Sequence, residues 1–100
     1  MIKRHPSILP THPGDLLRED ILPEMGMSKT HIAKALGISR QTLYDILNRK
    51  QPVTAATALR FGKFFGNGPD IWLRLQTAYD LAIAAETIDL SAVPEMRKIA

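Results

Sequence analysis

The sequence predicts a single all-α domain, and three observations support that fold class. The chain has 100 residues, the size of one ordinary domain. Apolar residues recur at the three- and four-residue spacing of amphipathic helices, and Pro, Ser, Thr and Gly stand where such helices begin or end. No β-rich region appears before residue 87. The absence of cysteine excludes a disulfide scaffold and a cysteine-ligated metal site.

The first predicted helix spans residues 13–21. Pro13 suits the first position of a helix, where its missing N–H is not needed. Leu22 precedes Pro23, and the residue before a proline disfavours helical geometry, so we expect the helix to end there. Residues 1–11 show no helical period and are predicted to form an extended N-terminal arm.

Two short helices are predicted next, over residues 29–36 and 39–48. Ser28 is a favourable N-cap for the earlier helix, because its hydroxyl can accept a backbone hydrogen bond. Gly37 can adopt the left-handed conformation that ends a helix. Ser39 is the N-cap of the later helix, whose apolar residues follow the helical period.

The pattern around Gly37 favours a helix-turn-helix over residues 28–48. Ala33 lies four residues before Gly37, where a larger side chain would keep the two helices apart. An ordinary αα-hairpin with a glycine turn is the alternative. The apolar residues expected to lock the two helices together are Ile32, Leu36, Ile38, Leu43 and Ile46.

Two further helices, over residues 55–65 and 69–86, complete a predicted five-helix domain over residues 12–86. Thr54 is the expected N-cap of the former. Pro69 begins the latter, and the Gly-Asn-Gly sequence before it separates the two helices.

The last of these helices and the C-terminal tail, residues 87–100, carry more apolar side chains than one core requires. A helix that is apolar over most of its circumference is buried on two sides, which favours a symmetric homodimer. Residues 87–92 alternate polar and apolar, which predicts a short strand that pairs with its two-fold mate. The alternative is a monomer whose tail folds back over the helix. The predicted dimer-interface residues are Leu73, Leu81, Ile83, Ile88 and Leu90.

Positive charge is concentrated in the middle of the chain. From Ser28 to Lys63 there are seven basic residues and one acid, a net charge of +6, against −3 elsewhere and +3 for the whole chain. Such a concentration is typical of a surface that binds a polyanion. A basic but merely solvated face is the alternative.

The helix predicted over residues 39–48 is the candidate recognition helix, which in a helix-turn-helix enters the major groove of DNA. Its outward side chains can hydrogen-bond base edges, and we expect those near its N-terminus to lie deepest in the groove. A solvated polar residue without a partner is the alternative for each position, and for Thr42 also inward packing. The predicted base contacts are Arg40, Gln41, Thr42, Tyr44, Asp45 and Asn48. The predicted phosphate contacts are Ser28, Lys29, Thr30, Ser39, Arg49 and Lys50.

No pattern for catalysis, a metal or a cofactor is found in the sequence. His5, His12 and His31 are scattered, and none has a second histidine three or four residues away. No apolar run approaches the ~20 residues of a membrane span. We therefore expect a DNA-binding protein of the cytoplasm rather than an enzyme, without metal, cofactor, small-molecule substrate or membrane partner.

Three stretches resemble the HigA-type antitoxins of the XRE (Cro/C1) helix-turn-helix superfamily: residues 36–43, 54–66 and 69–81. The His-Pro-Gly sequence at 12–14 also matches. The Trp-Leu-x-Leu-Gln stretch at 72–76 is more specific than the helix-turn-helix, which many unrelated regulators share. The resemblance therefore covers most of the chain.

This resemblance implies a five-helix lambda-repressor-like DNA-binding domain with a short C-terminal extension. It implies a bacterial, nucleoid-associated homodimer that represses its own operon and neutralises a HigB-type toxin, an mRNA-cleaving RNase. Lys29 stands where the superfamily often has Gln, and Gly68 where Ser is commoner. A stand-alone or phage-type repressor without a toxin, and an interaction module that no longer binds DNA, are the alternatives. The residues that the resemblance places against DNA are Ser28, Lys29, Ser39, Arg40, Gln41 and Thr42.

Overall fold

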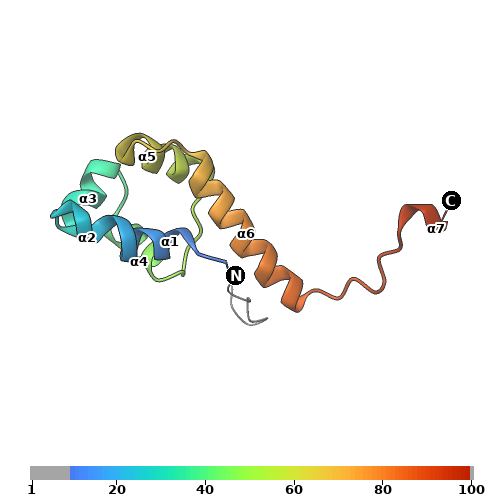
Figure 1. Cartoon of the computed structure of the whole chain (residues 1–100). Coiled ribbons are helices and arrows are strands. Elements are labelled where there is room, and N and C mark those ends of the chain that lie inside the picture. The colour runs from blue at the N-terminus through green and yellow to red at the C-terminus, as the bar shows by residue number, and fades with distance from the viewer. Residues whose placement is uncertain (1–9, 100) are drawn as a thin grey trace, which may run out of the picture.

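The computed structural model describes residues 10–99, so nearly all of the predicted arm, residues 1–9, lies outside the described residues. Figure 1 shows α1 to α5 gathered into one body, from which α6 and the tail extend. The predicted all-α class is confirmed, and the four helices predicted after residue 28 begin and end within one residue of their expected bounds. The elements are α1 (Pro13–Leu16), η1 (Leu17–Ile21), α2 (Leu22–Met25), α3 (Lys29–Leu36), α4 (Arg40–Leu47), α5 (Ala55–Phe65), α6 (Asp70–Thr87) and α7 (Met96–Ile99).

The first helical segment is longer than the sequence predicts. α1, η1 and α2 follow one another without a break, so the prediction that the helix ends before Pro23 was wrong. η1 is a π-helical turn, in which the N–H of Leu22 donates to the carbonyl of Leu17. The wider turn leaves Pro23 in the first turn of α2, where a missing N–H is tolerated. Gly26, with a φ of 65°, ends the segment.

The core lies where α3, α4, α5 and the start of α6 meet the first helical segment. Trp72 of α6 is fully buried and packs edge-on against Phe61 of α5, with ring centroids 5.1 Å apart. Its Nε1 donates to Oδ1 of Asn67 at 3.0 Å. Full burial of a large apolar side chain contributes about 1.5–3 kcal/mol. The buried apolar residues are Leu17, Ile32, Ala33, Leu36, Leu43, Ile46, Leu47, Val53, Ala58, Phe61 and Trp72.

The backbone of α1 lies directly on the backbone of α4. A Cβ added at Gly14 would overlap the carbonyl oxygen of Ile46, with backbone atoms of Leu47 also close by. Gly14 is therefore required by close approach rather than by its backbone angles. This contact fixes the distance between the first helix and α4.

His12 is the N-cap of α1, a role that the sequence did not indicate. Its Nδ1 accepts a hydrogen bond from the N–H of Gly14 at 2.9 Å, and its own N–H donates to Oδ2 of Asp15 at 3.2 Å. The buried imidazole packs edge-on against Tyr79 of α6, with centroids 4.8 Å apart. Burial lowers the pKa of His12 from its ordinary 6.5, although the charge of Asp15 opposes this. His12 thus joins the start of α1 to α6.

α6 packs on the body through one face near its start. Trp72 and Gln76 are buried, and Oε1 of Gln76 accepts a hydrogen bond from the N–H of Val53 at 2.8 Å. Leu73, predicted as a subunit contact, is half-buried and packs against the core. Its contact with a second subunit stays a prediction.

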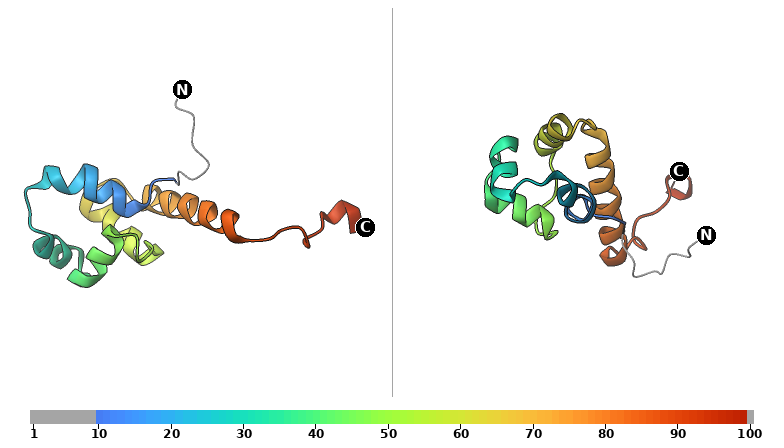
Figure 2. Two further views of the ribbon diagram at one scale, coloured as in Figure 1. Left: turned by 90° about the horizontal axis from the view of Figure 1, so that it is seen from below. Right: turned by 60° about the vertical axis from the view of Figure 1, so that its left-hand side comes forward.

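The tail contains no strand within the described residues. Residues 88–95 are irregular, apart from a turn in which the N–H of Val93 donates to the carbonyl of Leu90 at 3.0 Å. An isolated strand has no partner for its backbone hydrogen bonds, so the alternation at 87–92 does not form one in the single chain. Strand pairing across a dimer stays a prediction. Figures 1 and 2 show the tail running away from the body.

Candidate nucleic-acid interface

α3 and α4 form the predicted helix-turn-helix. Gly37, with a φ of 75°, ends α3, and the N–H of Ile38 donates to the carbonyl of Ala33 at 3.1 Å. Ala33 is only 2% exposed, as the expected close crossing requires. The structure therefore confirms the close-packed pair of helices and the glycine turn between them.

Ser28 and Ser39 are the N-caps of α3 and α4. Oγ of Ser28 accepts from the N–H of His31 at 3.1 Å, and Oγ of Ser39 accepts from the N–H of Thr42 at 2.9 Å. The Ser39 hydroxyl also donates to Oγ1 of Thr42 at 2.8 Å. The residue after each serine begins its helix, so the unbonded N–H groups of the first turn and the positive end of the helix dipole lie at these sites.

The outward face of α4 brings the predicted base contacts together. Arg40, Gln41, Tyr44 and Asn48 are exposed, whereas Thr42 and Asp45 are half-buried. Nε2 of Gln41 donates to Oδ1 of Asp45 at 2.8 Å, so these two side chains support each other one turn apart. Nη1 of Arg40 donates to Oγ1 of Thr30 on α3 at 3.3 Å. The face is polar and able to both donate and accept hydrogen bonds.

Arg49, predicted as a phosphate contact, is held by a carboxylate of the protein, and its phosphate contact stays a prediction. Its Nε and Nη2 donate to the two oxygens of Asp15 at 2.9 and 2.8 Å, and its backbone has a φ of 61°. Arg18 donates to Asp15 at 3.0 Å and to the carbonyl of Leu47, the last residue of α4. We call this group the Asp15 clamp. Arg18 lies three residues from Asp15, but Arg49 lies 34 residues from it, so no local sequence pattern predicts the pairing of Asp15 with Arg49.

The charges of the Asp15 clamp stabilise one another. Burial of Asp15 raises its pKa, but hydrogen bonds from Arg49, from the N–H of His12 and from Arg18, with the charge of Arg49, outweigh burial and hold the pKa of Asp15 below its usual range. The hydrogen bond to Asp15 in turn raises the pKa of Arg49. The ion pair between Asp15 and Arg49 therefore links the residues that follow α4 to α1.

Other basic residues beside α4 have no such partner. Lys29, Arg40 and Lys50 are exposed, and within residues 10–99 no carboxylate forms an ion pair with them. These three cations leave a positive potential around the outward face of α4, the arrangement that a polyphosphate backbone requires.

A second surface of interest is the exposed part of α6 with the tail. Four of the five predicted interface residues are exposed: Leu81 (65%), Ile83 (37%), Ile88 (56%) and Leu90 (60%). Ile71, at the start of α6, is also exposed. These apolar side chains lie on more than one side of α6 and in the tail, and the residues that the structure describes leave them exposed.

No group of three or more potential ligand side chains is placed to hold a metal ion within the described residues. No described helix is both long enough and apolar enough to cross a membrane.

The sequence matches the family model described as Helix-turn-helix over residues 17–72, which include α3, α4 and α5. The chain belongs to the Helix-turn-helix family. Among its relatives, it is 44% identical over 75 residues to Virulence-associated protein I of Dichelobacter nodosus, covering 75% of this chain and 69% of that protein. It is 33% identical over 72 residues to Antitoxin HigA-1 of Vibrio cholerae, covering 72% and 68%.

Solved structures of this Helix-turn-helix family include HigA antitoxins. The antitoxin HigA of Pseudomonas aeruginosa, solved with the higBA promoter, is similar with a TM-score of 0.75 and 32% identity, covering 87% of this chain and 99% of that one. The chain is thus a HigA-like DNA-binding protein of the Helix-turn-helix family, and the predicted resemblance to HigA antitoxins is confirmed.

Proposed function

We propose that this protein is the antitoxin of a two-gene module, represses its own operon as a homodimer, and neutralises a HigB-type mRNA-cleaving toxin. One observation carries the proposal: the polar outward face of α4, flanked by cations that form no ion pair within residues 10–99, occurs in a chain similar to an antitoxin HigA solved with the higBA promoter. The protein would act at the nucleoid in the bacterial cytoplasm.

In this proposal α4 is the recognition helix and enters the major groove of operator DNA. Arg40 and Gln41 at its N-terminal end read base edges, with Tyr44 and Asn48 further along. Asp45 orients the Gln41 amide through the bond between them. Phosphate contacts come from Lys29 and Lys50 and from the N-termini of α3 and α4, and they set the register of the protein on the duplex.

The proposed homodimer pairs α6 with its two-fold mate. The exposed Leu81 and Ile83 on α6 and Ile88 and Leu90 in the tail supply its apolar contacts. A two-fold dimer presents two recognition helices to half-sites one helical turn apart, ~34–36 Å, or a multiple of it.

The negative charge outside residues 28–63 supports the proposal that the protein neutralises a toxin. The chain outside residues 28–63 carries a net −3, and acidic side chains such as Glu19, Asp20 and Glu24 are exposed. An RNase that binds mRNA is expected to be basic, so this acidic surface suits it and also avoids DNA.

Two measurements test the proposed function. Co-expression with the neighbouring gene product should relieve its toxicity, and a promoter fragment should bind with a log–log salt slope of about −0.9 per phosphate neutralised. If the promoter binds but the neighbouring product is harmless, the chain is a stand-alone repressor. If the promoter does not bind or the salt response is flat, the chain is an interaction module and α4 is not a reading helix.

A further inference from the structure

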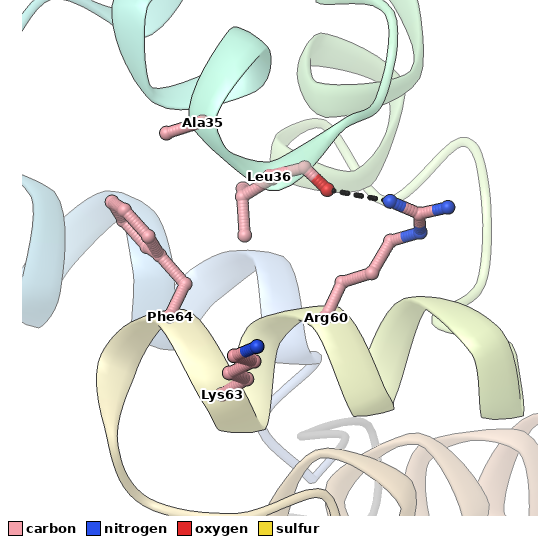
Figure 3. Close-up of a pocket in the computed structure, with 5 residues that line it drawn as sticks. All are labelled: Ala35, Leu36, Arg60, Lys63 and Phe64. Carbon is pink, nitrogen blue, oxygen red and sulfur yellow. Dashed lines mark hydrogen bonds between the residues drawn. The ribbon is translucent and has the colours of Figure 1, made fainter.

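A groove between α3 and α5 has an apolar floor and a cationic rim. It encloses about 470 Å³ and is lined by Ala35, Leu36, Arg60, Lys63 and Phe64. Figure 3 shows Phe64 and Arg60 rising from α5 on either side of Leu36, with Lys63 between them. The volume lies within the range of ~300–1,000 Å³ typical of ligand-binding clefts.

The groove contains two cations, Arg60 and Lys63. Nη1 of Arg60 donates to the carbonyl of Leu36 at 3.0 Å, and the guanidinium lies so close to Gly37 that an added Cβ would overlap it. Within the described residues no ion pair is formed by Arg60 or Lys63. The groove is therefore suited to a carboxylate that has apolar side chains beside it.

The chain itself contains a segment with that chemistry. Ile88, Asp89 and Leu90 place one carboxylate between two apolar side chains that are 56% and 60% exposed. From residue 75 to residue 96 the sequence has four acids and no Lys or Arg. Asp89 forms no ion pair within the described residues. Charge and apolar character are thus complementary between this segment and the groove.

The segment cannot reach the groove of its own chain. α6 has 18 residues, about 27 Å at 1.5 Å per residue, and Asp89 follows its far end by two residues. Figures 1 and 2 show α5 at one end of α6 and the tail leaving from the other. A two-fold axis across α6 would pair the helices antiparallel, which would bring the tail of a second copy beside the start of α6 and the end of α5.

We propose that the groove between α3 and α5 binds the Ile88-Asp89-Leu90 segment of a second copy of this chain. The incoming carboxylate lies between Arg60 and Lys63, and its apolar neighbours pack on Leu36 and Phe64. This inference rests on the proposed homodimer. It adds to the homodimer an exchanged tail, which contacts α3 of the helix-turn-helix and the neighbouring α5.

Zero-length coupling tests the contact in the unaltered protein. Carbodiimide joins a lysine to a carboxylate only when the two are in contact, and mixing ¹⁵N-labelled with unlabelled chains marks a link between subunits. We expect a mixed-isotope peptide that joins Lys63 to Asp89. If the protein sediments as a dimer but yields no such peptide, the tail contact is overturned, and the proposed homodimer is not.

Charge exchange gives a second readout that does not depend on coupling chemistry. Lys63→Glu and Asp89→Lys should each raise the dissociation constant of the dimer about tenfold, since two symmetric contacts turn repulsive. The double exchange should restore it, and Lys34→Glu on the exposed face of α3 is the matched control. Single variants that dimerise like the control overturn the tail contact, whereas a wild-type chain that sediments as a monomer overturns it together with the homodimer.

Discussion

Asp15 in the first turn of α1 and Arg49, two residues after α4, form a two-bond ion pair across 34 residues of sequence. The bonds measure 2.9 and 2.8 Å, and the Asp15 side chain is 9% exposed against 47% for Arg49. Because Arg18 bonds both Asp15 and the last carbonyl of α4, the candidate recognition helix is anchored to α1 at its C-terminal end. The orientation of its reading face therefore depends on residues that need not touch DNA.

Removing the Asp15 charge should destabilise the protein. Asp15→Asn leaves the Arg49 fork without its counter-charge in a partly buried place, and since Arg49 is half-exposed and can be hydrated, we expect a loss of about 1–3 kcal/mol in the free energy of unfolding. Urea unfolding measures it. The control is Asp20→Asn, an exposed acid of η1, expected within about 0.5 kcal/mol of the wild type. Equal stability of both variants would contradict the clamp.

The same pair predicts an acid response. The pKa of Asp15 is lowered in the fold from its ordinary 3.8, so its stabilisation is complete above that pH and is lost as pH falls through the lower folded value. We expect the wild type to lose more stability than Asp15→Asn between about pH 4 and pH 2. Parallel curves for the two proteins over this range would be inconsistent with the pKa shift.

Much of the fold was predictable because its signals are local. The bounds of α3, α4 and α5 follow from caps that act within four residues, and each of those caps is present in the structure. The first helix was predicted too short because a proline usually ends a helix, and the π-turn that accommodates Pro23 is set by packing around it.

The candidate site also has a part that local sequence signals predict and a part that only tertiary contacts determine. The polar face of α4 follows from the helical period, so Arg40, Gln41, Tyr44 and Asn48 share a face as predicted. Sequence could not tell which cations are free, because an internal partner is decided by tertiary contacts. Arg49 is held by the carboxylate of Asp15, 34 residues away in sequence, and no residue near Arg49 predicts this contact.

The buried His12 should make the protein less stable in mild acid. A protonated Nδ1 cannot accept the Gly14 N–H, and burial lowers the folded pKa below 6.5, so unfolding takes up a proton and stability falls as pH drops below about 6.5. His12→Asn retains a capping acceptor that does not titrate. Urea unfolding between pH 8 and pH 5 should show a flatter dependence in His12→Asn, while the exposed control His31→Asn follows the wild type.

A methyl group at residue 14 should push the first helix away from α4. In Gly14→Ala the added Cβ overlaps the carbonyl oxygen of Ile46, a backbone atom that cannot move alone, so we expect a loss of about 1–3 kcal/mol. Thr11→Ala, an exposed change just before α1, is the control and should be near neutral. A fully stable Gly14→Ala would mean that the two helices are not in backbone contact.

Arg40 and Lys50 should affect DNA binding in different ways. Arg40→Ala removes the proposed base-edge contact, so discrimination at one base pair in each half-site should fall by ~1–3 kcal/mol, with little change at other positions. Lys50→Ala removes the proposed phosphate contact, so all sequences should bind more weakly and the log–log salt slope should become shallower by about one per subunit. Titrations of single-base operator variants at several salt concentrations measure both effects. Uniform weakening by Arg40→Ala would reassign Arg40 to the phosphate backbone and leave Gln41 as the leading base contact of α4.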